Sequence, residues 1–234
     1  MSNLVEMRGV VKGYGQNKVI FNGLNLDIPA GKIIGLLGPN GSGKTTMIKL
    51  LTGLLSKEAG EIRINGHEIG PESKAEVAYL SERIYFNEYM KVKQVIKMFQ
   101  DFYQDFDEVR AYEMLKNLNI DPNSTIKKLS KGNKEKVQLI MVMSRHAKLY
   151  LLDEPIAGVD PAARDYILHT ILTNYDENAT ILISTHLITD IEGILDEVIF
   201  IRQGQIILQG NADAIRQDKN ASIDEIFREV FRTW

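Results

Sequence analysis

The chain has 234 residues, and hydrophobic side chains make up 44% of them, enough to bury the core of a sizeable domain. Its net charge of −3 argues against a nucleic-acid partner held by bulk electrostatics, and the absence of cysteine excludes disulfides and thiolate metal sites. No apolar run approaches the roughly 20 residues of a membrane span. Residues 1–10 lack the layout of a signal peptide. We therefore expect a cytosolic protein with no nucleic-acid partner.

Taken in chain order, short extended runs separated by turns come first, ending in the strand KIIGLL. An apolar pattern of helical period follows over residues 44–55. The sequence EIRING (61–66) ends in Asn-Gly, which predicts a hairpin turn. Residues 91–118 indicate two amphipathic helices separated near residues 105–107, and a further helical run, QLIMVMSRHA, comes after them.

The second half of the chain alternates strands and helices. The apolar strand LYLLDEP is followed by a helix at 161–175, the strand TILIST, a helix at 187–195 and the strand pair EVIFIRQGQIIL. A short amphipathic helix is expected in the tail ASIDEIFREVFRTW. This alternation predicts an α/β fold with a mostly parallel sheet, to which the antiparallel start and the helical middle are additions.

The loop GPNGSGKTT (38–46) stands between a strand and a helix. Gly38, Gly43, Lys44 and Thr45 match the phosphate-loop pattern G-x-x-x-x-G-K-[ST]. Glycines let backbone N–H groups surround phosphate oxygens, and the helix N-terminus adds positive charge. Lys44 is expected to reach the β- and γ-phosphates, and the Thr45 hydroxyl is expected to ligate Mg²⁺. A glycine-rich turn that only caps a helix is the alternative, which the strand–loop–helix context disfavours. The expected nucleotide contacts are Gly38, Pro39, Asn40, Gly41, Ser42, Gly43, Lys44, Thr45 and Thr46.

The strand LYLLDEP (149–155) ends in two acidic residues. Asp153 is placed to hold Mg²⁺ through water at the end of a second buried strand. Glu154 is placed to polarise an attacking water as a general base. A strand that ends in a solvated acidic turn is the alternative, and the phosphate loop favours the catalytic interpretation.

With these motifs in order, the chain resembles the ATP-binding-cassette (ABC) family over nearly its whole length. LSKGNKEK (129–136) stands where the family has its LSGGQ signature, about twenty residues before LYLLDEP. GVDP (158–161) matches the D-loop, with Asp160 at the key position. ISTH (183–186) matches the switch motif and its histidine, His186.

The resemblance implies a P-loop NTPase core with an N-terminal antiparallel β subdomain and an inserted helical subdomain, all within one ABC ATPase domain, 1–234. The core and β subdomain would comprise about 1–80 and 149–234, and the helical subdomain about 83–148. Tyr14 stands where the family stacks an aromatic ring on adenine, although a lone tyrosine is more often a packing residue.

The resemblance also implies ATP and Mg²⁺ as cofactors and a second ATPase subunit, either a copy of this chain or a related one. Ser130, Lys131 and Gly132 would contact the γ-phosphate bound by that subunit, so that two ATP molecules are sandwiched. ATP would favour the closed dimer, and hydrolysis would let it open.

Two departures from the family pattern stand out. Lys131 replaces the first glycine of the signature, and Asn133 replaces its glutamine. Lys131 either adds positive charge near the partner's nucleotide or is simply solvated. Glu82 stands about where the family has its Q-loop glutamine, and we assign it to both the catalytic and the metal-binding residues. A carboxylate there still approaches Mg²⁺ or the attacking water, but its charge is compatible with slow turnover.

SKGNKEK, LYLLDEPIAGVDP and the short tail are similar to the ATPase subunits of Gram-positive exporters of the ABC-2 type. This implies ATP hydrolysis that powers a separate integral membrane permease, and a place on the inner face of the cell membrane. The aromatic patch Tyr85, Phe86 and Tyr89 is expected to face the helical subdomain and contact the permease. The alternatives are a soluble ABC ATPase that remodels or regulates a protein complex, and a slow nucleotide-dependent switch.

Overall fold

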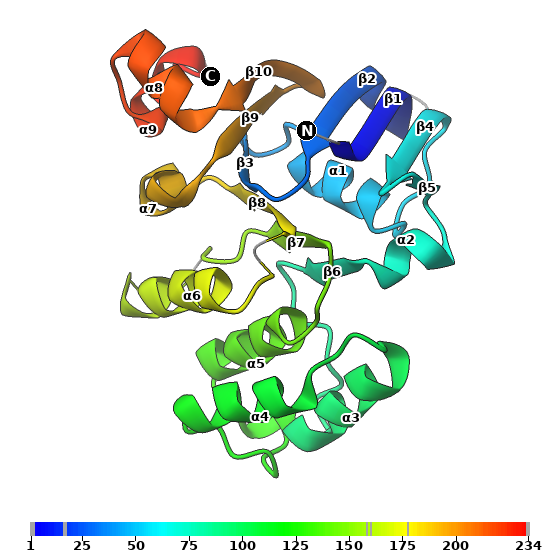
Figure 1. Cartoon of the computed structure of the whole chain (residues 1–234), viewed down its shortest axis with the longest axis vertical. Coiled ribbons are helices and arrows are strands. Elements are labelled where there is room, and N and C mark those ends of the chain that lie inside the picture. The colour runs from blue at the N-terminus through cyan, green and yellow to red at the C-terminus, as the bar shows by residue number, and fades with distance from the viewer. Residues whose placement is uncertain (1–2, 16–17, 158, 160, 177, 233–234) are drawn as a thin grey trace.

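The computed structural model describes residues 3–15, 18–157, 159, 161–176 and 178–232. Its larger sheet has six strands, and β10 is antiparallel to β9 while the other neighbours are parallel (Figure 1). In spatial order the strands are β10 (Gln205–Asn211), β9 (Glu197–Arg202), β3 (Ile33–Leu37), β8 (Thr180–Thr185), β7 (Leu149–Asp153) and β6 (Val77–Leu80).

A second, antiparallel sheet lies beside the first (Figure 1). Its order is β2 (Lys18–Pro29), β1 (Asn3–Tyr14), β4 (Ala59–Ile64) and β5 (His67–Glu68). The turn between β4 and β5 places Asn65 and Gly66 at φ of 50° and 80°. Both values lie in the left-handed region that a two-residue hairpin turn needs, which confirms the hairpin prediction.

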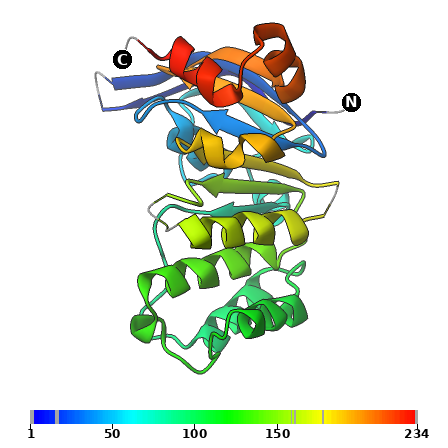
Figure 2. The ribbon, with the colours of Figure 1, turned by 90° about the vertical axis from the view of Figure 1, so that its left-hand side faces the viewer.

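Helices α3, α4 and α5, which follow one another between β6 and β7, gather at one end of the molecule, and α8 and α9 lie at the other (Figures 1 and 2). The helices are α1 (Lys44–Leu51), α2 (Pro71–Ala75), α3 (Val92–Phe102), α4 (Glu108–Asn117), α5 (Lys131–Met143), α6 (Pro161–Thr173), α7 (Ile188–Ile191), α8 (Ala212–Lys219) and α9 (Ile223–Val230), with short 3₁₀ turns at Ile126–Lys128 and Glu192–Ile194. Among these described helices, none combines the length and apolar character needed to cross a bilayer.

The larger sheet separates two hydrophobic cores. Strands β3, β7 and β8 are buried along their whole length, as expected for parallel strands covered on both faces. Alternate side chains of β3 enter different cores. Ile34 and Leu36 pack with α1 and the antiparallel sheet, whereas Ile33 and Leu37 pack with the core of the helical region. The α/β fold predicted from the sequence is confirmed.

Helix α1 is shorter than the apolar pattern predicts, because it ends at Leu51 and not at residue 55. Gly53 follows in the left-handed region, at φ 69°, and reverses the chain. Leu54, which continues the apolar pattern, consequently points out of the core and is 62% exposed.

Two other segments near the end of the chain differ from the prediction. The helix expected over residues 187–195 is a short α7 followed by a 3₁₀ turn. Helix α8 was not predicted. Ala212 is its only buried residue, so the sequence carries no apolar period there to reveal the helix.

Candidate functional site

The carboxyl ends of three parallel strands bring the predicted motifs together. Asp153 at the end of β7 lies opposite Ser184 of β8, and Leu37 at the end of β3 lies opposite Thr185. The glycine-rich loop after β3, the acidic pair of β7 and His186 after β8 therefore meet at one edge of the sheet. This edge is where open α/β sheets bind ligands.

The loop between β3 and α1 adopts a conformation that requires glycine. Gly41 and Gly43 have φ of 80° and 116°, in a region that other residues rarely adopt. A Cβ on Gly43 would also lie 2.9 Å from the ring of Phe21. Gly43 is the N-cap of α1, and it has no side chain to accept a hydrogen bond from the first N–H groups of that helix. Those donors remain available to an anionic ligand.

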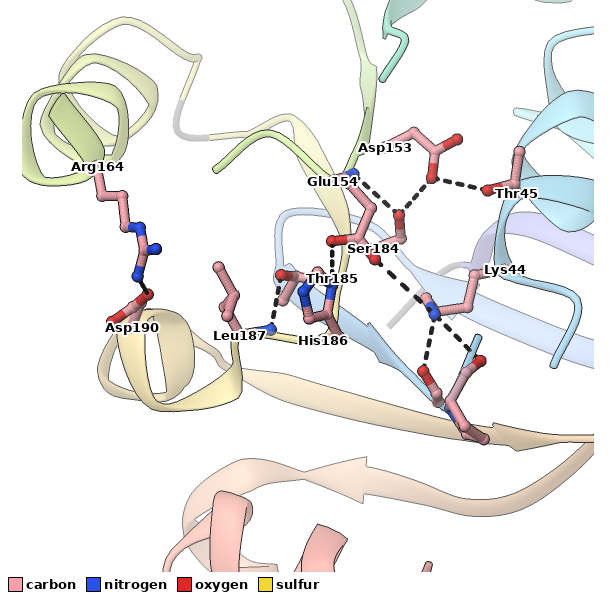
Figure 3. A network of polar contacts seen from close by, with 12 residues as sticks. Lys44, Thr45, Asp153, Glu154, Arg164, Ser184, Thr185, His186, Leu187 and Asp190 are labelled. Carbon is pink, nitrogen blue, oxygen red and sulfur yellow. Dashed lines mark hydrogen bonds and ion pairs between the residues drawn. The ribbon is translucent and has the colours of Figure 1, made fainter. Parts of the chain in front are cut away.

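Lys44 is buried at the start of α1, and its ammonium group is held by the loop itself. Nζ donates to the carbonyl oxygen of Gly38 at 2.7 Å and to that of Pro39 at 3.4 Å. It lies 3.9 Å from Oε1 of Glu154 (Figure 3). Burial lowers the pKa of Lys44, while the carboxylates of Glu154 and Asp153 act in the opposite direction. The result is a cation directed at the phosphate loop.

Asp153 is buried between two hydroxyl groups. Its Oδ1 accepts from Oγ of Ser184 at 2.6 Å and from Oγ1 of Thr45 at 3.2 Å (Figure 3). Mg²⁺ is usually bound through one or two protein oxygens together with waters and phosphates, and Thr45 and Asp153 offer this donor set. Within the described residues, no cluster of three or more His, Asp or Glu side chains forms a site for a metal on its own.

Glu154 has an unusual backbone conformation for a residue with a side chain. Its φ is 52°, and its N–H donates to the carbonyl oxygen of Ser184 at 2.9 Å and to the hydroxyl of Ser184 at 3.2 Å. The side chain meets His186, with 2.9 Å between Oε2 and Nδ1 (Figure 3). Strained backbone of this kind is concentrated at functional sites. The strain accompanies a carboxylate directed at both Lys44 and His186.

Ser184 is a site residue that sequence reasoning missed. It is buried, and it holds the carboxylate of Asp153 and the backbone of Glu154 at the same time. The available signal was a hydroxyl residue two positions before His186, at the end of an apolar strand.

These elements enclose a cavity of about 450 Å³. The predicted residues that line it are Tyr14, Asn40, Gly41, Gly43, Lys44, Thr45, Thr46, Glu82, Glu154 and His186. Tyr14 is exposed, with its hydroxyl 3.4 Å from Oγ1 of Thr46. Ser42, within the same loop, is buried, while Gly38 and Pro39 accept hydrogen bonds from Lys44 through their carbonyl groups.

The predicted signature residues do not line this cavity. Ser130 is the N-cap of α5, and its hydroxyl accepts from the N–H of Asn133 at 3.2 Å. The ammonium group of Lys131 is exposed, 3.7 Å from the carboxylate of Glu135 one turn later. Gly132 follows in the first turn of α5. Asp160 lies outside the described residues.

The fold and this arrangement define a P-loop nucleotide-binding protein. A sequence model of the ABC transporter family matches residues 21–157. The lantibiotic transport ATP-binding protein SrtF of Streptococcus pyogenes is 31% identical over 231 residues, covering 96% of each chain. The ABC transporter ATP-binding protein YtrB of Bacillus subtilis is 30% identical over 92% of this chain and 74% of its own.

A solved structure of an ATP-binding subunit of an ABC transporter is also similar, with a TM-score of 0.87 and 28% identity. The similarity covers 97% of this chain and 98% of that one. The chain belongs to the ABC transporter family, and it is an ATP-binding ATPase of that family.

Proposed function

We propose that this ATPase binds ATP with Mg²⁺, pairs with a second ATPase subunit around the nucleotide, and powers a separate membrane permease that exports its cargo. The observation that carries the proposal is the convergence of Lys44, Glu154 and His186 on one cavity beside a glycine-rich helix start. The names of the relatives, which include a lantibiotic transport protein, support the exporter assignment.

Different residues of the cavity are proposed to bind the phosphates, the Mg²⁺ ion and the adenine. Lys44 exchanges the carbonyl groups of Gly38 and Pro39 for phosphate oxygens, because charge-assisted bonds to an anion are the stronger ones. Thr45 and Asp153 would hold Mg²⁺, which neutralises charge on the phosphates. Tyr14 at the cavity wall offers its ring to the adenine.

Glu154 serves as the general base in this proposal. Its carboxylate accepts the proton of a water whose oxygen bonds to the γ-phosphorus as the bond to the departing ADP breaks. The hydrogen bond from His186 orients that carboxylate, and Ser184 holds the backbone beneath it. Glu82 reaches the same cavity from the segment after β6.

A second subunit is proposed because the signature lies outside the cavity of its own chain. The N-terminus of α5, with Ser130 and Gly132, is a second place where helix N–H groups can meet phosphate. Such a site would combine Lys44 of one subunit with Ser130 of the other. Shared ATP then stabilises the closed pair, and hydrolysis releases it.

The permease contact is proposed at an apolar groove of about 680 Å³ between α3 and the β6 edge of the sheet. Leu54, Tyr85 and Phe102 line it and are exposed, as is typical of an interaction surface. The predicted aromatic patch therefore contributes only Tyr85 to this groove. Phe86 is buried against Phe99, and the ring of Tyr89 lies beside Lys127, outside the groove.

Two measurements test the proposal. Purified protein should hydrolyse ATP only with Mg²⁺, and a pull-down from solubilised membranes should recover an integral membrane protein. The double variant Leu54→Ser, Phe102→Ser should lose that protein and keep its basal ATPase rate. Val109→Ser is the matched control, because Val109 is an equally exposed apolar residue on α4 that does not line the groove. Capture that survives the double variant would refute the groove as the contact.

A further inference from the structure

A buried glutamine on α5 holds the segment that carries Glu82. The side-chain nitrogen of Gln138 donates to the carbonyl oxygen of Ser81 at 2.7 Å and approaches that of Arg83 at 3.4 Å. A local hydrogen bond also stabilises the segment, because the hydroxyl of Ser81 donates to the carbonyl oxygen of Arg83 at 2.5 Å. The residues on both sides of Glu82 are thus bonded to one amide group.

The chemistry of these neighbours determines how the amide is oriented. A carbonyl oxygen can only accept a hydrogen bond, so two carbonyl groups facing one side chain require its NH₂ group on that side. The oxygen of Gln138 consequently faces away, and among the residues that the structure describes it is buried without a hydrogen-bond partner. A buried acceptor in this situation destabilises the fold, whereas an apolar side chain of the same size would not.

From this geometry we infer that Gln138 is a positioning residue for Glu82. Its NH₂ group donates to the segment while its oxygen is left without a partner. An apolar residue would avoid the unsatisfied oxygen, so we infer that the donated hydrogen bonds are the reason for a glutamine at this position. Glu82 itself makes contact with both the nucleotide cavity and a neighbouring hollow of about 290 Å³ that Gln138 also lines. We call the hydrogen bonds from Gln138 to Ser81 and Arg83 the clamp. The effect of the clamp on turnover rests on the proposed function of this cavity, whereas the clamp itself does not.

The clamp links two distant points of the proposed reaction. Gln138 lies eight residues after Ser130 on the same helix, about 12 Å along its axis. Helix α5 connects the two points without a break, so we expect a displacement of its Ser130 end to shift the backbone on both sides of Glu82. A ligand met by Ser130 therefore changes the position of Glu82 without touching it.

A spin label at position 82 tests the clamp directly. The chain has no cysteine, so Glu82→Cys creates a unique attachment site. Gln138→Met removes the donor and keeps the volume, and it should shorten the rotational correlation time of the label roughly twofold or more. Gln209→Met is the control for the substitution itself, because the amide of the exposed Gln209 likewise donates to a carbonyl oxygen, that of Asp27 at 2.6 Å, far from this segment. A label whose mobility is the same in Gln138→Met and in the parent overturns the inference.

Ser81→Ala provides a milder test, at a half-buried loop position where loss of the hydroxyl leaves the hydrophobic core intact. It should loosen the label by a smaller amount, so the clamp stays testable if Gln138→Met fails to fold. In protein that retains Glu82, Gln138→Met should lower kcat severalfold and leave the Kd for ATP within about twofold. A looser label together with no ATP hydrolysis by the unmutated protein would support the clamp and refute the proposed reaction, so the two failures are distinguishable.

Discussion

Helices α1 and α5 begin in opposite ways, although the first residue of each is a lysine. The N-cap of α1 is Gly43, which offers no side chain to the first N–H groups, and Lys44 is buried with its ammonium group directed at the loop. The N-cap of α5 is Ser130, whose hydroxyl already accepts an N–H of the first turn, and Lys131 is exposed beside Glu135. The start of α1 therefore has N–H groups that its cap leaves open and a positioned cation. At the start of α5 one N–H group is already capped, and the lysine is exposed rather than buried.

The difference separates a complete anion site from half of one. Helix N-termini attract anions through their N–H groups and dipole, yet that attraction is worth only about 0.3–1 kcal/mol when exposed. A buried lysine adds the charge-assisted bonds that make the first site strong. The start of α5 lacks such a lysine, so it needs a phosphate that is already bound at a complete site. The comparison is open to test through predictions that run from the largest expected effect to the smallest, the last with a pH dependence of its own.

The largest effect is expected at the complete site, from Glu154→Gln. Because the amide cannot accept the proton of the attacking water, ATPase turnover should fall roughly 10²–10⁴-fold while ATP binding persists. Trapped with ATP, the variant should elute as a dimer from a sizing column. Glu113→Gln, an exposed change of the same type on α4, should have no effect. Turnover near the wild-type rate in Glu154→Gln would place the base elsewhere.

Removing each lysine in turn compares the two helix starts directly. Lys44→Ala should weaken ATP binding about ten- to a hundredfold, since hydrogen bonds to charged groups contribute roughly 1.5–3 kcal/mol. Lys131→Ala should change the same affinity less than about twofold, because an exposed ion pair contributes little. Calorimetric titration with ATP measures both. Equal losses in the two variants would mean that the two sites are equivalent.

Mixing experiments ask whether the two halves belong to one composite site. Ser130→Arg and Lys44→Ala should each be nearly inactive alone, since every shared site has lost one half. Mixed in equal amounts, they should regain at most about a quarter of wild-type activity, because random pairing into symmetric dimers leaves half of them with one intact site of two. Full activity in either variant alone would refute sharing, and no recovery would indicate a different partner subunit or strict coupling of the sites.

The smallest effect is expected from the caps. Ser130→Ala and Asp107→Ala should each lower the free energy of unfolding by about 1 kcal/mol, as loss of an N-cap does. Asp107 caps α4 far from the cavity and accepts from the N–H of Arg110 at 2.9 Å. Urea melts would show the two losses, and only Ser130→Ala should also lower ATPase activity. Equal ATPase rates in the two variants would make Ser130 a purely structural cap.

The Asp107 cap also has a defined pH dependence. The backbone N–H of Arg110 is the main cause that lowers the pKa of Asp107 below its ordinary value, with Arg110 and His146 acting in the same direction. The stabilisation is therefore present above the ordinary pKa and is lost as the pH falls through the lowered value. In Asp107→Ala this part of the acid dependence should disappear.

Motifs that are contiguous in sequence could be predicted in advance. The phosphate loop, the acidic strand end and His186 were assigned from residue type and order, because a loop with positive φ values needs glycine wherever it occurs. The apolar strands were equally readable, since burial on both faces leaves an uninterrupted hydrophobic run. The shorter α1 and the unpredicted α8 show the limit, because helix ends and polar helices depend on what packs against them.

Contacts between segments distant in the sequence were decided only by the tertiary structure. Ser184 joins Asp153 and Glu154 because of the register of β8 against β7, and Gln138 meets Ser81 across 57 residues of chain. Neither pairing can be derived from the sequence, because each depends on how whole elements pack. The sequence by itself determined the chemistry of the site through the residues that a phosphate requires. Packing decided which other side chains hold those residues in place, and that the signature lies outside the cavity at the phosphate loop of its own chain.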